Sequence, residues 1–201
     1  MHNRGGSVLV TLANVRHAFL EWERIAGVES WGPRVQMIEK GLAELIHELT
    51  NRDIRHKFNR DSATRIVSQK VLYLLQSSGL LLSPSYEFEF HFSGPHSPYW
   101  AQLGHEIASG GQDQIMQVSE DYTAIKGIIG QGSMTWLVAV ATCHWYHCVE
   151  GLGRNAAKKA ATEEKRHRAL LHFDDAWDLL ERTDWLRGHL PHGSKADQPA
   201  R

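Results

Sequence analysis

The sequence predicts a mainly α fold of six or seven helices with a small β-hairpin, for which a winged-helix-like arrangement is one form. Apolar residues recur every three or four positions over most of the chain, while one segment alternates strictly between apolar and polar residues. Hydrophobic residues make up 42% of the 201 residues, which suits a soluble domain with its own core. We expect a single helical domain over 7–187 between a disordered lead at 1–6 and a disordered tail at 188–201.

The expected helices follow from apolar stripes and from residues that start or stop a helix. Two amphipathic helices are predicted in the N-terminal part of the domain (7–60), at 7–26 and 33–49, and 51–60 reads as a polar connection. A third helix is capped by Asp61 or Ser62, runs to about Ser78 and ends at Gly79. Its polar residues, Arg65, Ser68, Gln69, Gln76 and Ser77, are expected to point outward. Further helices are expected at 99–109, 133–149, 156–170 and 173–186.

One segment has the period of a half-buried strand. Residues 86–92 read Tyr-Glu-Phe-Glu-Phe-His-Phe, so the aromatic side chains point one way and Glu87, Glu89 and His91 point the other. The run Gly94–Pro98 is expected to end this strand, because its prolines cannot continue a hydrogen-bonded ladder. A second strand at Ile115–Val118 is its expected partner.

Cysteine usage and hydropathy predict a cytoplasmic protein without a membrane partner. Cys143 and Cys148 lie five residues apart on a predicted helix, so their side chains point in different directions and a disulfide between them is not expected. The N-terminus lacks the apolar core of a signal peptide. The longest apolar run, Trp136–Ala141, is far shorter than the roughly 20 residues that cross a bilayer.

Charge is balanced overall but uneven along the chain. The 22 Lys and Arg residues oppose 23 Asp and Glu, which disfavours a globally basic nucleic-acid binder. Residues 71–150 hold one lysine against seven acidic residues, while the segments on either side are net basic. An acidic middle third suits a basic protein partner. Acidic residues scattered over solvated faces would explain the same pattern.

No motif in the sequence points to catalysis, so we predict a non-enzymatic protein without a metal or cofactor. Four potential zinc ligands stand close together, Cys143, His144, His147 and Cys148. On a helix they face different directions, which favours buried packing or local hydrogen bonds. A metal site completed by His91, His96 or His105 is the alternative. A nucleophile elbow, a phosphate-binding glycine loop and a His-Glu-x-x-His motif are absent from the sequence.

Four segments in order resemble the YwgA-type protein family. Residues 68–79 read Ser-Gln-Lys-Val-Leu-Tyr-Leu-Leu-Gln-Ser-Ser-Gly, and 90–97 read Phe-His-Phe-Ser-Gly-Pro-His-Ser. Residues 136–146 and 172–180 are similar to two further family segments, so the resemblance covers about 65–180 and makes 61–187 the family-like region. Ser93 and His96 stand where the family tends to have aromatic residues. Related patterns occur in the toxin-binding domain of DarG-type antitoxins and in Panacea (SocA-like) antitoxin domains.

The resemblance implies a helical binding module that neutralises a partner, such as a toxin, by covering its functional surface. DarG-like domains are thought to present an acidic, DNA-like surface, which the acidic middle third would suit. The Gly94-Pro95 turn and the amphipathic pair Tyr99 and Trp100 favour an interface around the strand, although both rings also suit core packing. The expected partner-binding residues are Glu87, Glu89, His91, Gly94, Pro95, His96, Ser97, Tyr99 and Trp100.

The alternative is a nucleic-acid-binding regulator with winged-helix-like elements. In that arrangement the helix at 62–78 would be a recognition helix and the strand after it a wing. A basic stretch at 156–168 would add phosphate contacts. The residues that would have to converge on one face are Arg65, Lys70, Lys158, Lys159, Lys165, Arg166 and Arg168.

Overall fold

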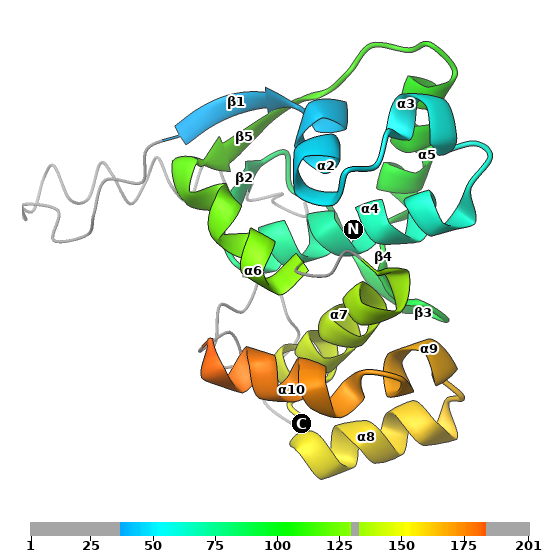
Figure 1. The fold of residues 1–201 in the computed structure, drawn as a ribbon, viewed down its shortest axis with the longest axis vertical. Coiled ribbons are helices and arrows are strands. Elements are labelled where there is room, and N and C mark those ends of the chain that lie inside the picture. The colour runs from blue at the N-terminus through cyan, green and yellow to red at the C-terminus, as the bar shows by residue number, and fades with distance from the viewer. Residues whose placement is uncertain (1–36, 130–132, 184–201) are drawn as a thin grey trace, which may run out of the picture. The chain divides into compact units, whose positions relative to one another are not determined.

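The computed structural model describes residues 37–129 and 133–183, all of which belong to one compact unit beginning at Met37. The expected helix at 7–26, the lead at 1–6 and the tail at 188–201 lie outside these residues. Within the described ranges the fold is mainly α with small antiparallel sheets, as predicted (Figure 1). The strands are β1 (Met37–Gly41), β2 (Leu81–Ser83), β3 (Glu89–His91), β4 (Gly94–His96) and β5 (Ile115–Ser119). The helices are α2 (Leu42–Thr50), α3 (Ile54–Lys57), α4 (Ser62–Ser77), α5 (Pro98–Ala108), α6 (Lys126–Ile129), α7 (Met134–Cys148), α8 (Arg154–Glu163), α9 (His167–Leu170) and α10 (Phe173–Arg182), with a 3-10 helix, η1, at Glu120–Ile125.

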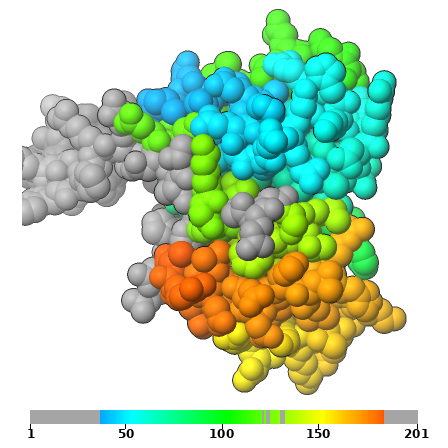
Figure 2. Space-filling model, in the orientation of Figure 1, coloured from blue at the N-terminus to red at the C-terminus, as the bar shows by residue number. Residues whose placement is uncertain are grey.

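Helices α4 and α7 pack against each other at the centre of this unit. On its other sides α4 contacts α2, α3, α5 and the strands β2 and β4, while α7 contacts α8, α9 and α10 (Figure 1). Figure 2 shows α8 and α10, in yellow and orange, on the side of the unit away from α2 and α3. Almost every residue of α4 from Val67 to Leu75 is buried, so this helix forms the middle of the hydrophobic core.

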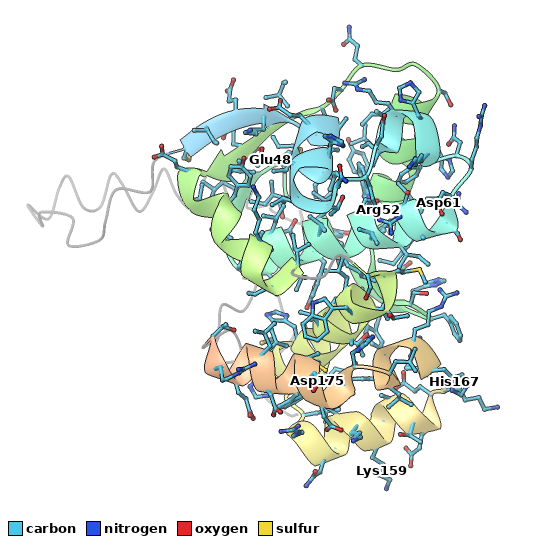
Figure 3. All side chains as sticks on the ribbon, viewed as in Figure 1. Glu48, Arg52, Asp61, Lys159, His167 and Asp175 are labelled. Carbon is cyan, nitrogen blue, oxygen red and sulfur yellow. The ribbon has the colours of Figure 1, made fainter. Side chains whose placement is uncertain are left out.

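The ends of α4 follow the sequence prediction. The Asp61 carboxylate caps the helix by accepting from the amides of Ala63 (3.0 Å) and Thr64 (3.1 Å). Figure 3 shows Arg52 beside this cap, and its guanidinium lies 3.3 Å from the Asp61 carboxylate. At the other end Gly79 adopts a φ of 72°, and the following Leu80 amide donates to the Leu75 carbonyl, which closes the helix as glycine commonly does.

The helix predicted at 33–49 was wrong over residues 37–41, and its first four residues lie outside the described ranges. Residues 37–41 form strand β1, which pairs antiparallel with β5 from Met37↔Ser119 to Gly41↔Ile115, and α2 starts only at Leu42. Five residues of sheet pairing outweigh the helical spacing of the apolar residues, because that spacing is only a local preference. The polar connection at 51–60 also contains one helical turn, α3.

The predicted strand pairing was wrong. Only residues 89–91 of the alternating segment form a strand, and its partner is β4, not β5. Strand β5 instead lies between β1 and β2. Pro95 occupies β4 opposite Phe90, because alternate pairs of an antiparallel ladder exchange no hydrogen bonds and can include a proline. Phe92 falls in the turn, where its side chain is 61% exposed and not on the buried face that alternation predicted.

Two further expectations on helices were wrong. The helix predicted at 156–170 is broken between α8 and α9 at Lys165, which has a φ of 56°, and the Arg166 amide reaches back to the Ala161 carbonyl. On α4, Ser68, Gln69 and Ser77 were expected to point outward but are buried. Because α4 is enclosed by its neighbours over most of its surface, it is not free to lie in a DNA groove as a recognition helix would.

Candidate functional site

Two glutamines of α4 hold the chain at both ends of the β3–β4 hairpin. Gln69 Nε2 donates to the Ser97 carbonyl (3.1 Å), and its Oε1 accepts from the Ser97 amide (2.9 Å). Gln76, two turns further along α4, makes the same pair with the carbonyl and amide of Tyr86, each at 2.7 Å. The hairpin segment 86–97 is therefore fixed to the central helix by four hydrogen bonds, two at each end.

The middle of the hairpin lies close to α4 and α7. Gly94 has a φ of 84°, and a Cβ atom at this position would lie 2.9 Å from Thr142 Oγ1 on α7. Only glycine fits both the backbone conformation and this close approach. Lys70 Nζ donates to the Pro95 carbonyl (2.5 Å), which adds a third contact from α4. Ser97 then caps α5 through its hydroxyl, and Pro98 starts that helix.

A pocket of about 390 Å³ opens between the hairpin, α4 and α5. Helix α4 contributes one face, at spacings of three and four residues, and the hairpin and α5 form the opposite walls. The lining contains several cationic or imidazole side chains and no Asp or Glu. The lining residues are Phe58, Ser62, Arg65, Ile66, Gln69, Lys70, His91, Ser93, Gly94, His96, Ala101 and His105.

Lys70 is the most unusual of these residues, because its side chain is charged in water yet only 2% exposed here. Within the described residues its one hydrogen bond goes to the Pro95 carbonyl, and it forms no ion pair. Burial without a counter-ion lowers the pKa of Lys70 to about 7. Such a position is too deep for the surface phosphate contact that the sequence suggested.

The histidines of the pocket differ in their surroundings. The His96 ring lies next to that of His91, tilted by 39° with 5.1 Å between ring centroids, and its Nδ1 is buried without a hydrogen-bond partner among the described residues. The Glu89 carboxylate lies 4.0 Å from that atom. Burial, and then the neighbouring charges of His91 and Lys70, lower the pKa of His96. His105 pairs through Nδ1 with the Asn59 side chain at 2.6 Å.

The outer face of the hairpin segment carries the predicted contact residues that remain accessible. Glu87, Glu89 and His91 are exposed, whereas Phe88 and Phe90 between them face the protein. Two aromatic side chains are also exposed: Phe92 in the hairpin turn is 61% exposed, and Tyr99 on α5, whose ring centroid lies 5.9 Å from that of Tyr86, is 60% exposed. They are two of the four large hydrophobic residues that the described part of the chain exposes.

The other predicted contact residues have structural positions. Gly94, Pro95 and Ser97 are buried residues of the hairpin segment itself, and Trp100 is fully buried against Phe58, with 5.5 Å between ring centroids. Trp100 therefore belongs to the core, and of the Tyr99-Trp100 pair only Tyr99 can reach a partner.

The basic residues of α8 and α9 are engaged with carboxylates to different degrees. Lys158 pairs with Asp174, and Lys159 lies 3.7 Å from Glu163. Arg166 is largely covered: it pairs with Glu164 at 2.8 Å, lies over the Phe90 ring and donates to the His91 carbonyl. Lys165 and Arg168 are exposed. Arg166 thus supports the hairpin from one side, while Arg65 and Lys70 line the pocket.

The cysteine and histidine cluster of α7 has separate partners. Cys143 is buried, and its Sγ donates to the Phe173 carbonyl (3.6 Å). His144 accepts or donates at Nδ1 with the Tyr73 hydroxyl (2.8 Å), and His147 Nδ1 lies 3.1 Å from the Leu152 carbonyl. A search of the described ranges finds no group of three or more His, Cys, Asp or Glu residues placed to hold a metal ion.

Sequence reasoning missed several residues of this site. Phe58, Ile66, Ala101 and Phe92 were not singled out, and His105 was considered only as a metal ligand. The i, i+4 spacing of Ser62, Ile66 and Lys70 places them on one face of α4, but the sequence does not show what that face meets. The pocket exists only because the hairpin folds back over α4.

Comparisons with known proteins give no relative. No family model matches the chain, and no curated protein and no solved structure matches it. The resemblance to YwgA-type proteins therefore stays a prediction from the residues. In the described ranges, none of the helices has the length and apolar character needed to cross a membrane.

Proposed function

We propose that this chain is a non-enzymatic protein-binding module, antitoxin-like or defence-associated, that covers a functional surface of its partner in the cytoplasm. The observation that carries the proposal is the exposure of two aromatic side chains, Phe92 in the hairpin turn and Tyr99 at the start of α5, together with the exposed carboxylates of Glu87 and Glu89. Aromatic residues are enriched among the residues that contribute most to binding at the centre of protein interfaces.

Rigidity is the second property that suits this face to binding. Gln69 and Gln76 fix both ends of the segment, and Arg166 supports its back through Phe90 and the His91 carbonyl. A surface that is already ordered loses little conformational entropy on association. Carboxylates next to aromatic rings fit a partner that offers a basic patch around an apolar groove.

A pull-down from the native host tests this proposal. The tagged full-length chain is used with and without nuclease, and bound proteins are identified by mass spectrometry. The double variant Phe92→Ser/Tyr99→Ser is compared with Leu171→Ser, which changes a 68% exposed residue on another element. We expect a stoichiometric protein partner that survives nuclease, is lost with the double variant and is retained by the control.

Other outcomes would contradict the proposal. A partner held equally by the wild type and by Phe92→Ser/Tyr99→Ser would place the contact elsewhere. Recovery of nucleic acid, with binding that falls steeply with salt and disappears after nuclease, would favour the regulator instead. The charge-reversal variant Glu87→Lys/Glu89→Lys gives an independent check, because it should lower the affinity for a basic protein partner and raise the affinity for a nucleic acid.

A further inference from the structure

The pocket beneath the hairpin has features that contact with a protein partner does not require. Lys70 is buried and Arg65 is half-buried, and both line the cavity, whereas the acidic and aromatic residues proposed for protein binding are exposed. A buried lysine costs free energy, so its position calls for a physical explanation. The hydrogen bond to the Pro95 carbonyl uses only one of the three N–H donors of Lys70.

Arg65 adds a second cation to the lining. Its Nη1 donates to the Phe58 carbonyl at 2.8 Å, which uses one of five guanidinium donors. Neither Arg65 nor Lys70 forms an ion pair with a carboxylate in the described part of the chain, and the pocket that they line contains no Asp or Glu. Two cations that share one cavity without a counter-ion form a site for a negatively charged ligand.

The other polar groups of the pocket suit the same ligand. His96 Nδ1 is buried and has no hydrogen-bond partner among the described residues, and Ser93 and Ser62 bring hydroxyl groups to the lining. The carboxylate nearest to this atom, that of Glu89, is 4.0 Å away and belongs to an exposed side chain. The site therefore offers N–H and O–H donors and lacks an acidic residue in its walls.

One wall of the pocket is apolar. Ile66 and Ala101 bring partly exposed apolar side chains to it, and Phe58, which also borders the pocket, is fully buried. The volume of about 390 Å³ lies within the range of small-molecule sites and exceeds what a single inorganic anion fills. A ligand with an anionic end and an organic end would match both kinds of wall.

We propose that this pocket binds a small phosphate-type anion, with its oxygen atoms held by Lys70, Arg65 and His96. The anion is either a phosphate monoester, whose organic part lies against Ile66 and Ala101, or inorganic phosphate. This binding goes beyond the proposed protein contact and does not depend on it. The lowered pKa of Lys70 is consistent with the site. Burial lowers this pKa because no carboxylate of the described chain pairs with the ammonium group, and a bound anion would supply that negative charge.

Calorimetric titration of the full-length chain tests the site with three probes: inorganic phosphate, AMP and adenosine. We expect AMP and inorganic phosphate to bind and adenosine to bind at least about tenfold more weakly than AMP, since it lacks the anion. If AMP binds more tightly than inorganic phosphate, the site is assigned to phosphate monoesters. If the two bind with equal affinity, the site is assigned to free phosphate.

Variants locate the site. Lys70→Met and Arg65→Met should each weaken binding about tenfold or more, as expected for loss of one charge-assisted hydrogen bond. Lys159→Met removes a charge of the same kind from the outer side of α8 (Figure 3) and should leave the affinity unchanged. Amide chemical shifts of the wild-type chain give a reading that needs no variant, and phosphate should move those of Ser93 and Gly94.

Several results would overturn the proposal. One is that the folded wild type binds neither phosphate nor AMP, and another is that adenosine binds as tightly as AMP. A loss of affinity in Lys159→Met equal to that in Lys70→Met and Arg65→Met would also overturn it, as would amide shift changes confined to α8. Binding of single-stranded DNA without binding of either small phosphate would also overturn it. If Lys70→Met does not fold, Arg65→Met and the chemical shifts of the wild type still test whether the pocket binds the anion. The pull-down outcome bears on the outer face alone, so the two proposals fail separately.

Discussion

Gln69 completes both backbone hydrogen bonds of Ser97, donating through Nε2 at 3.1 Å and accepting through Oε1 at 2.9 Å. The side-chain amide thus takes the place of a neighbouring strand. Both residues are buried, so water cannot replace either bond. This relationship fixes the end of the hairpin and the start of α5 at a single point, and with it one wall of the pocket.

Gln69→Met should destabilise the protein by about 1–3 kcal/mol, because the Ser97 amide would stay buried without a partner, while the Ser97 carbonyl would keep only its bond from the Ala101 amide (3.1 Å). Gln76→Met should cost less, since its contacts with Tyr86 are only partly buried. Gln102→Met is the control, because Gln102 is exposed and bonds only Glu106 in the described structure. Urea unfolding measures all three, and equal stabilities of Gln69→Met and Gln102→Met would refute the role of the clamp.

Gly104→Ala should destabilise the protein by about 1–3 kcal/mol, as overpacking does. A Cβ atom at this position of α5 would lie 2.3 Å from Phe58 Cζ. The added variant Phe58→Leu should recover part of this loss by making room. Gly127→Ala in α6 is the matched control, since a Cβ atom there meets nothing within 4 Å and alanine favours the helix. Thermal unfolding that shows no difference between the two alanine variants would rule out the steric explanation.

His144 should make stability depend on pH. Burial, and then the neighbouring charge of His147, lower the pKa of His144 from 6.5 to about 4, so the folded protein keeps this imidazole neutral while the unfolded chain takes up a proton. The stabilisation is therefore complete above pH 6.5 and is lost as the pH falls towards 4. The loss is on the order of 3 kcal/mol at most.

Denaturation at several pH values between 7.5 and 4 measures this dependence. His144→Gln should flatten the profile, because glutamine can still bond the Tyr73 hydroxyl but does not titrate. His167→Gln changes an exposed histidine at the start of α9 (Figure 3) and should keep the wild-type slope. A wild-type slope in His144→Gln would assign the pH dependence to other groups.

Glu48 should stabilise the fold through its ion pairs with Lys40 (2.8 Å) and Lys126 (3.3 Å), which join α2 to β1 and α6. The hydrogen bond from Lys40 is the main cause that lowers the pKa of Glu48 from 4.5 to about 2. Its stabilisation is present above pH 4.5 and is lost as the pH falls through 2. Glu48→Gln should cost about 1 kcal/mol at pH 7, because the cluster remains partly exposed.

The matched control for Glu48 is Glu163→Gln, which removes a longer and more exposed ion pair, 3.7 Å from Lys159. We expect almost no change in the stability of that variant. The deficit of Glu48→Gln should shrink in high salt and near pH 2. A deficit that is independent of both would show that packing around Glu48, not charge, is responsible.

The sequence by itself determined the helices whose ends carry local chemistry. Asp61 and Gly79 mark α4, the apolar stripe marks α7, and Ser97 with Pro98 starts α5. Caps, apolar periodicity and proline act within a few residues, so they can be read from a single chain. The alternation at 86–92 also placed Glu87, Glu89 and His91 on an exposed face correctly.

Only the tertiary structure decided which strands pair and what the polar residues of α4 do. Residues 37–41 form a strand because β5 is available to pair with them, and Gln69 and Lys70 are buried because the hairpin offers its backbone as their partner. The sequence pattern classed those α4 residues as solvent-facing, since a polar side chain looks the same whether water or a buried carbonyl satisfies it. Contacts between residues far apart in the chain make that difference, and they also create the pocket.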